Sequence, residues 1–322
     1  MRRTMLTGLA ALAALATSAS ADNHLAPEPD PAAEAGAFEI TIDPDRYERM
    51  TVPVTIGGSG PYRFLIDTGA QATVVTPKIL TDLEMEPSGR ATLVAMGSRR
   101  VVETVELDGL EFADRTLNNL TAPLLQTHHV GADGILGLDT LQDMRVLIDF
   151  REDRMLVTGA GEDGGTKGYE IVVRARRKLG QMIITNARID GVRTAIIIDT
   201  GAQTSHGNSE LKRRLRKRQR ETLLTKDVNG VIYESSMAFA GKLEMAGLTM
   251  SQIPIGFSDS PVFAQLGLED RPALILGMQN LRSFERVAID FASRRILFDL
   301  PAGSGVEHLK KQTFFPSRLG AP

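Results

Sequence analysis

Hydrophobic and polar residues alternate along much of the chain in short runs that end at glycine, asparagine or aspartate, a pattern typical of strands and tight turns. Two hairpins are predicted on this basis. One covers residues 50–66 with a turn at Gly57-Gly58-Ser59-Gly60, and the other covers residues 182–198 with a turn at Asp190-Gly191. Further strands are expected at residues 101–107 and 237–243, and helices only in short segments. The pattern predicts an all-β protein.

The chain repeats itself. Residues 62–71 (YRFLIDTGAQ) return as residues 194–203 (TAIIIDTGAQ), an offset of 132 positions (199 − 67). A second motif follows in each half, Ile-Leu-Gly at 135–137 and at 275–277, and each copy leads to Ile-Asp-Phe, at 148–150 and 289–291. Two motifs that recur in the same order predict two tandem units of similar fold.

The N-terminus predicts export from the cytoplasm. Two basic residues, Arg2 and Arg3, precede the short apolar run 5–16 and the small-residue sequence Ala19-Ser20-Ala21. This order is typical of a cleaved signal peptide over residues 1–21, and the alternative is an uncleaved membrane tether. We therefore expect a periplasmic or secreted protein.

The remaining chain divides by composition. Residues 22–37 are rich in Ala, Pro and acids and predict a flexible leader. The predicted bounds are 38–158 for the first unit, 159–168 for a Gly-rich linker, 169–300 for the second unit and 301–322 for a C-terminal tail. With 322 residues, 42% of them hydrophobic, the chain is long enough to form about two packed units.

Composition removes several kinds of chemistry. The chain has no cysteine, and its five histidines form no recognisable metal-binding motif, so we expect neither a disulfide nor a metal centre. The formal net charge is −3, which gives no overall basic field, so we expect no nucleic-acid partner.

The candidate chemistry lies in the repeated aspartates. Asp67 and Asp199 each follow a buried apolar strand and precede Thr-Gly-Ala. If the two units pack about a pseudo-two-fold axis, the two carboxyl groups meet, and two carboxylates that share one site cannot both ionise. One then acts as general base and the other as general acid. A single DTGA turn would be an ordinary turn at the end of a strand. Here the turn occurs twice, and each copy is followed later in the chain by an Ile-Leu-Gly motif.

These motifs resemble those of the retropepsin-like (clan AA) aspartic proteases, in the bacterial exported form with two tandem DTGA units. The resemblance covers residues 50–158 and 180–300. It implies two β-barrel domains that form a pepsin-like bilobal pseudo-dimer, no cofactor, and a polypeptide substrate. Peptide bonds would be hydrolysed by a water activated between Asp67 and Asp199.

The resemblance also assigns the active-site turn. In the family, Thr68 and Thr200 bond across to the backbone of the opposite unit, although a turn within one unit is the alternative. The amides of Gly69 and Gly201 would donate to the carboxylates. Ala70 and Ala202 stand where pepsin-like enzymes usually carry a hydroxyl group, which alanine lacks.

Two further turns are candidates for the flaps that such enzymes close over a substrate. They are Met96-Gly97-Ser98 and Asn229-Gly230, whose glycines lie 30 and 31 residues beyond the two aspartates (97 − 67 and 230 − 199). Strands are expected at 223–228 and 231–234, on either side of Asn229-Gly230. The alternative is a pair of ordinary surface hairpins.

The second unit departs from the first in two places. Residues 204–208 are polar where residues 72–75 of the first unit predict a strand, so His206 is interpreted as a loop residue, with an approach to the active site as the alternative. A short basic helix is predicted over residues 211–220, with Leu211 and Leu215 on its buried side. Its charges predict a solvated face, with contact to an anionic lipid, cell-wall polymer or acidic protein as the alternative. The basic residues are Lys212, Arg213, Arg214, Arg216, Lys217, Arg218 and Arg220.

Three functions remain open at this point. The first is a monomeric aspartic endopeptidase with both aspartates in one chain. The second is a non-catalytic module that holds an extended peptide in the same cleft. The third is a protease assembled by dimerisation in trans. Two mutually repelling carboxylates favour an enzyme over a binding module, and the short connection between units favours pairing within one chain.

Overall fold

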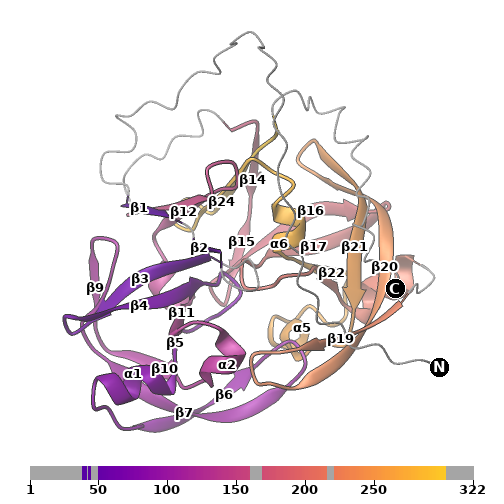
Figure 1. Cartoon of the computed structure of the whole chain (residues 1–322). Coiled ribbons are helices and arrows are strands. Elements are labelled where there is room, and N and C mark those ends of the chain that lie inside the picture. Colours follow the sequence, from indigo (N-terminus) through magenta and orange to yellow (C-terminus); the bar gives the residue numbers. More distant parts are fainter. Residues whose placement is uncertain (1–37, 42, 45–49, 160–168, 216–220, 302–322) are drawn as a thin grey trace, which may run out of the picture.

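The computed structural model describes residues 38–41, 43–44, 50–159, 169–215 and 221–301 (Figure 1). Strands dominate, and the two repeated units form two lobes of curled sheets, so the predicted all-β, bilobal fold is confirmed. The predicted signal peptide, the leader, the linker beyond Gly159 and the tail beyond Pro301 lie outside the described residues. No helix in the described ranges has both the length and the apolar character needed to cross a membrane.

The first lobe consists of two sheets. A seven-stranded sheet has the order β5-β11-β4-β3-β8-β9, with β2 paired to β3, and a three-stranded sheet has the order β10-β7-β6. Their strands are β2 (Asp43–Pro44), β3 (Met50–Ile56), β4 (Ser59–Ile66), β5 (Val74–Val75), β6 (Gly89–Val94), β7 (Arg99–Leu107), β8 (Leu110–Phe112), β9 (Arg115–Leu117), β10 (Leu120–Pro123) and β11 (Gly134–Leu136).

The second lobe has one eight-stranded sheet in the order β15-β16-β17-β22-β18-β21-β20-β19. Its central strands are apolar because both of their faces are covered; all four residues of β22, for example, are buried. The strands are β15 (Arg176–Lys178), β16 (Gln181–Ile189), β17 (Val192–Ile198), β18 (His206–Gly207), β19 (Glu221–Lys226), β20 (Ile232–Met245), β21 (Leu248–Phe257) and β22 (Ala273–Leu276).

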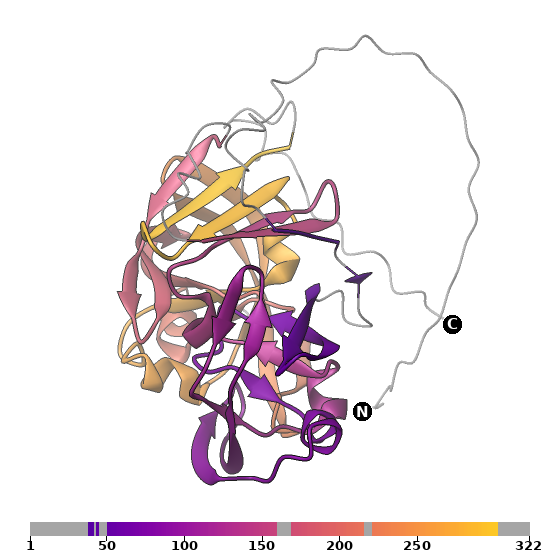
Figure 2. The same ribbon diagram turned by 90° about the vertical axis from the view of Figure 1, so that its left-hand side faces the viewer.

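A fourth, six-stranded sheet joins the lobes, with three strands from each half of the chain (Figure 2). Its order is β1 (Phe38–Thr41), β13 (Arg154–Thr158), β12 (Arg145–Asp149), β23 (Arg286–Asp290), β24 (Arg295–Asp299) and β14 (Ile171–Arg174). The central pair, β12 and β23, is antiparallel with Leu147 opposite Ala288. These strands contain the two Ile-Asp motifs, so equivalent segments of the repeat pair with one another about a local two-fold axis.

The two repeated motifs lie side by side in each lobe. Strand β4 is parallel to β11, with Ile66 opposite Leu136, and β17 is parallel to β22, with Ile198 opposite Leu276. The glycine of Ile-Leu-Gly is required by close packing, because a Cβ on Gly137 or Gly277 would lie 2.5–2.6 Å from the backbone of Ala72 or Ala202. This approach brings each Ile-Leu-Gly segment directly beneath the turn that follows the aspartate.

The structure corrects three details of the expected elements. The first hairpin turn is only Gly57-Gly58, both with positive φ, and β4 starts at Ser59; the remaining glycine, Gly60, belongs to an irregularity in the strand pairing. The turn around Asn229-Gly230 has five residues, 227–231, and not two, so β19 ends at Lys226 and β20 begins at Ile232, whereas the strands were expected to reach residues 228 and 231. His206 lies in the buried strand β18 and not in a loop.

Helices are short, as expected, but more numerous than the sequence pattern indicated. Segments α3 (Leu138–Leu141) and α6 (Met278–Leu281) follow the two Ile-Leu-Gly motifs, and α4 (Ser209–Leu215) begins the basic run. Three helices were not expected, because segments of four to six residues are too short to show a 3.6-residue period. They are α1 (Pro77–Asp82), α2 (Thr127–Val130) and α5 (Pro261–Gln265).

Candidate active site

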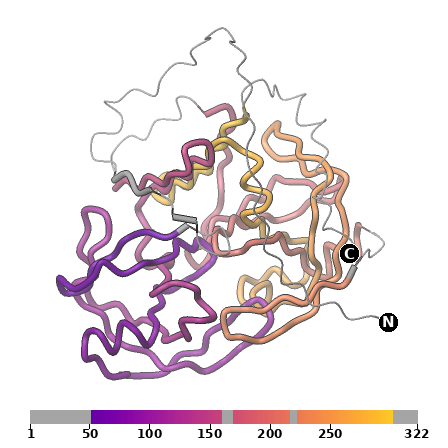
Figure 3. Tube along the Cα trace, viewed as in Figure 1, coloured from indigo at the N-terminus to yellow at the C-terminus, as the bar shows by residue number. Residues whose placement is uncertain are grey.

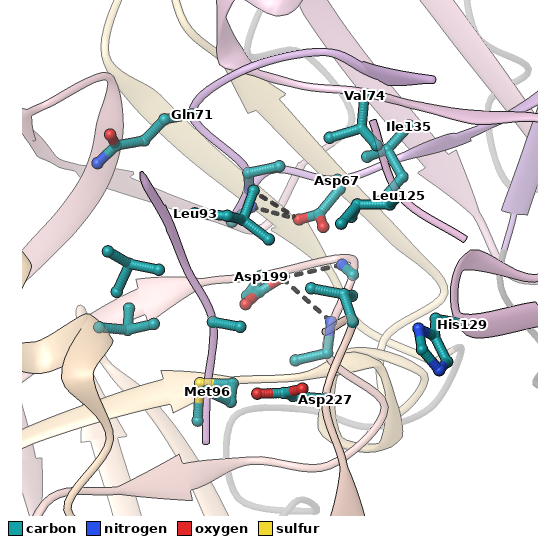
Figure 4. A pocket seen from close by; sticks show the side chains of 18 of the residues that line it. Asp67, Gln71, Val74, Leu93, Met96, Leu125, His129, Ile135, Asp199 and Asp227 are labelled. Carbon is teal, nitrogen blue, oxygen red and sulfur yellow. Dashed lines mark hydrogen bonds between the residues drawn. The ribbon is translucent and has the colours of Figure 1, made fainter. Parts of the chain in front are cut away.

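Asp67 and Asp199 lie at the ends of β4 and β17 and line one cavity of about 700 Å³ between the lobes (Figure 4). Each backbone amide donates to the carbonyl of the adjacent Ile-Leu-Gly strand, at 3.1 Å, which fixes the start of the turn. The two carboxyl groups face the opposite turns. Gly69 packs against the carboxyl of Asp199, and Gly201 packs against that of Asp67.

The two turns bind their own carboxylates in the same way. Oδ1 of Asp67 accepts hydrogen bonds from the amides of Gly69 (2.7 Å) and Ala70 (3.0 Å). Oδ1 of Asp199 accepts from the amides of Gly201 (2.9 Å) and Ala202 (3.1 Å). The backbone therefore holds both carboxyl groups in a fixed orientation.

The electrostatics of the pair are dominated by enclosure and mutual repulsion. Burial raises the pKa of Asp199 well above its ordinary value, and the negative charge and hydrogen bond of Asp67 raise it further. The amides of Gly201 and Ala202 lower this pKa, but each by less than burial or the charge of Asp67 raises it. The arrangement therefore favours one shared proton over two ionised carboxylates.

Thr68 and Thr200 connect the two turns behind the aspartates. Each threonine hydroxyl accepts a hydrogen bond from the backbone amide of the other threonine, at 3.1 Å. The hydroxyls also donate to the carbonyls of Ile198 (2.9 Å) and Ile66 (2.8 Å) of the opposite unit. Both side chains are buried. The cross-bonded arrangement is the one found, not a turn confined to one unit.

The cavity walls are mostly apolar and differ between the lobes. Val74, Leu125 and Ile135 line the first lobe's side, whereas Val262 and Leu266 line the second lobe's side. Apolar walls with a few convergent polar groups are typical of a ligand-binding cleft.

Gln181 is a cavity residue that the sequence interpretation missed. Its side chain is buried, and its Nε2 donates to the carbonyl of Gly69 at 2.5 Å. The first residue of β16 in the second unit therefore supports the turn of the first unit. Nothing local in the sequence marks this contact, because the two residues are 112 positions apart.

The two candidate flap turns lie at the tips of hairpins that contribute to the cavity wall. Met96-Gly97-Ser98 connects β6 to β7, and Asn229-Gly230 lies between β19 and β20. Residues of both hairpins, including Leu93, Met96 and Val228, line the cavity. The sequence thus located two hairpins that border the same cleft from opposite halves of the chain.

His206 also lines the cavity, in a position equivalent to Val74. Val74 is paired with Ile135 and His206 with Ile275, so the two residues occupy matching places in the two lobes. The Nε2 atom of His206 lies 2.9 Å from the hydroxyl of Thr204. Burial lowers the pKa of His206 to about 4. The 132-residue offset from Val74 is the signal that would have placed it on a strand.

The basic run is described only in part. Leu211 is fully buried, and Leu215 packs against the core, as the spacing predicted. Arg213 and Arg214 are exposed and form ion pairs with Glu210, at 2.8 and 2.7 Å. The remaining residues of the run, from Arg216 to Arg220, lie outside the described part of the chain.

Two comparisons bear on this site. A family model described as aspartyl protease matches the chain twice, at residues 52–140 and 185–279, and each interval contains one DTGA turn and one Ile-Leu-Gly motif. No curated protein matches the chain. In the described ranges, no group of three His, Asp or Glu side chains is arranged to hold a metal ion.

Proposed function

Because the chain belongs to the aspartyl protease family, we propose that it is an endopeptidase that hydrolyses peptide bonds with Asp67 and Asp199 as its catalytic residues. The observation that carries the proposal is the meeting of these two carboxyl groups, from identical turns of one chain, at one apolar cavity.

The chemistry follows from the shared proton. The ionised carboxylate takes a proton from a water as that water attacks the peptide carbonyl carbon, and the protonated carboxyl donates its proton to the carbonyl oxygen. A tetrahedral diol results. Proton transfer to the nitrogen then breaks the C–N bond and releases an amine and a carboxylic acid. The pair returns to its single-proton state, and no covalent intermediate is formed.

The cost of the site supports an enzyme rather than a peptide-binding module. Two enclosed carboxyl groups that face each other destabilise the folded protein, and such costly groups are typical of catalytic sites. A module that only binds extended peptides through backbone hydrogen bonds has no need of them.

Pairing within one chain supports activity as a monomer. The threonine cross-bonds and the β12–β23 pairing both connect one half of the chain to the other. Each site is therefore complete in one copy, unlike a protease that is assembled from two chains.

Location and surface contacts belong to the same proposal. The basic, apolar and small-residue order of residues 1–21 supports export to the periplasm or the medium. The exposed arginines of α4 support contact with an anionic surface, although their pairing with Glu210 reduces the charge that they present.

Digestion of a denatured protein mixture tests the proposal. The mature chain is compared with Asp67→Asn and with Asp270→Asn, an exposed aspartate outside the cavity wall, and cut sites are identified by mass spectrometry. We expect new termini with the wild type and with Asp270→Asn but not with Asp67→Asn. Equal cleavage by Asp67→Asn would refute the dyad. Peptide binding without cleavage by the wild type would instead support the binding module.

A further inference from the structure

The tips of the two cavity hairpins bind to each other. The β6–β7 tip comes from the first half of the chain and the β19–β20 tip from the second, and they lie side by side (Figure 3). Gly97 packs against the ring of Tyr233, and a Cβ on Gly97 would lie 2.5 Å from a ring carbon. Glycine therefore permits this close approach.

Asp227 stands at the centre of the contact. Its side chain is 8% exposed. Oδ1 accepts hydrogen bonds from the amides of Asn229 and Val231, both at 3.0 Å, and so closes its own turn. Oδ2 accepts from the amide of Gly97 at 3.2 Å and from the hydroxyl of Ser98 at 2.7 Å, and so holds the other tip.

Two more hydrogen bonds join the tips. Asn229 Nδ2 donates to Ser98 Oγ at 2.9 Å, and Arg100 Nη1 donates to the carbonyl of Asn229 at 3.1 Å. Ser98 thus accepts from one tip residue and donates to another. The contact is a small polar network in which a buried carboxylate is the main acceptor, and such charge-assisted bonds are stronger than neutral ones.

Apolar contacts hold each tip against the opposite lobe. Met96, from the first hairpin, packs against a buried cluster of the second lobe that includes Leu266. Val228, from the second hairpin, packs against a buried cluster of the first lobe that includes Val74 and Leu125. Since all of these residues line the cavity, the joined tips close the space that contains the dyad.

Only the second hairpin supplies a carboxylate to this network. The amides of Ala95 and Asp227 play the same part in their turns, because each donates to the carbonyl that closes the turn, that of Ser98 or of Val231. Ala95 has no acceptor side chain. The carboxylate that accepts the bonds between the tips is therefore not repeated in the two units and belongs to the second half of the chain alone.

From this geometry we infer that Asp227 is a positioning residue that latches the two hairpin tips together and so keeps the cavity over the dyad closed. The biological role of the latch rests on the proposed peptidase function, but the experiment that tests the latch does not. Opening the cavity to a polypeptide separates Asp227 Oδ2 from Gly97 and Ser98, while the bonds of Oδ1 preserve the second tip's own shape.

The absence of cysteine makes a direct test feasible, since two introduced cysteines take spin labels selectively. Val101→Cys on β7 and Ile232→Cys on β20 place labels on the two hairpins, at residues that are 67% and 65% exposed. Electron paramagnetic resonance then gives the distribution of distances between them. The mature labelled chain is compared with its Asp227→Asn, Ser98→Ala and Ser98→Thr variants.

A narrow distribution is expected for the parent, at least twofold broader distributions for Asp227→Asn and Ser98→Ala, and a return to the narrow one for Ser98→Thr, which keeps the hydroxyl. Asp270→Asn is the matched surface control. If Asp227→Asn fails to fold, Ser98→Ala still removes two hydrogen bonds between the tips, those that Ser98 Oγ makes with Asp227 and Asn229, without replacing a residue of the second turn. Unchanged distributions in the folded variants would overturn the latch. The measurement requires no turnover, so it remains valid even if the protein cleaves no peptide. Normal cleavage together with unchanged distances between the labels would reject the latch but not the peptidase function.

Discussion

Gly201 packs directly against the carboxyl group of Asp67, a residue from the other half of the chain, and Gly69 packs in the same way against Asp199. Each turn therefore needs glycine mainly because the carboxyl group of the opposite aspartate leaves no space for a Cβ, and less because of the turn's own backbone conformation. The two carboxyl groups meet because each turn leaves no side chain between itself and its counterpart.

Replacement of Gly201 by alanine tests this relationship. The new Cβ would displace the carboxyl of Asp67, so we expect a loss of kcat/KM of about 100-fold or more, since small misplacements of catalytic groups have effects of this order. Gly159→Ala, where a Cβ meets no atom within 4 Å, is the control. Peptide cleavage and thermal unfolding are measured for both. Retention of most activity in Gly201→Ala would show that the pair tolerates a wider separation.

The pH profile reports the shared proton. Because the pKa of Asp199 is raised, we expect a bell-shaped dependence of kcat/KM, with activity between the two macroscopic steps of the pair and a centre at roughly pH 5 to 6.5. Below the lower step both carboxyls are protonated, and above the upper step both are charged. Ala70→Ser with Ala202→Ser adds hydroxyl donors that favour the charged form, which lowers the upper pKa. An alkaline limb that stays in place or moves upward would contradict this role of the two positions.

Acid stability depends on His206. Its pKa falls from 6.5 to about 4 on burial, so the folded state disfavours the charged imidazole. A lowered pKa contributes stability that is present above pH 6.5 and lost as the pH falls toward 4. Relative to His206→Val, the wild type should therefore lose about 3 kcal/mol of unfolding free energy between pH 7 and pH 4.

Urea unfolding at several pH values measures this difference. Valine is the matched replacement because it occupies the equivalent position, Val74, in the first lobe. His128→Val, at an exposed histidine, controls for the loss of an imidazole. If the wild type and His206→Val lose stability in parallel, the histidine is charged in the folded protein or escapes burial.

Activity should not depend on association of chains. Because both aspartates and both halves of the joining sheet belong to one chain, specific activity is expected to stay constant on dilution. Light scattering over the same concentrations gives the mass of the active species. A fall in specific activity that accompanies dissociation of a dimer would favour assembly in trans.

The basic run is expected to act at surfaces and not at the cleft. Replacing Arg213, Arg214, Arg216 and Lys217 by Gln should leave cleavage of a short soluble peptide unchanged and weaken low-salt sedimentation with anionic vesicles, because the charges bind by a salt-screened attraction. Equal sedimentation of both forms would show that the basic run is only a solvated surface and does not bind the vesicles.

The sequence allowed the fold and the meeting of the aspartates to be predicted, because both follow from a repeat. Identical motifs in the same order imply two similar units, and the pairing of β12 with β23 confirms that equivalent segments meet. The catalytic roles of Asp67 and Asp199 stay predictions that the variants test. The threonine cross-bonds were available only through the resemblance, since a turn within one unit satisfies the same local sequence.

Contacts between distant segments escaped prediction. Asp227 and Gln181 act through partners more than 100 residues away, and no periodicity or turn preference indicates which tip or which carbonyl each one reaches. His206 was misplaced because its polar neighbours hide a two-residue strand, and tertiary burial outweighed local preference. The two candidate flap turns were predicted because glycine favours tight turns, but the hydrogen bonds that join them were not predicted.

The antiparallel pairing of β12 with β23 means that a single chain contains both halves of the cleft. In a symmetric dimer of identical chains, every substitution is made twice, once on each side of the substrate. Here it is made once. The second unit has His206 where the first has Val74, and Asp227 where the first has Ala95. A dimer of identical chains does not permit such differences. One rim of this cleft can therefore be redesigned for a new sequence preference while the other is left untouched.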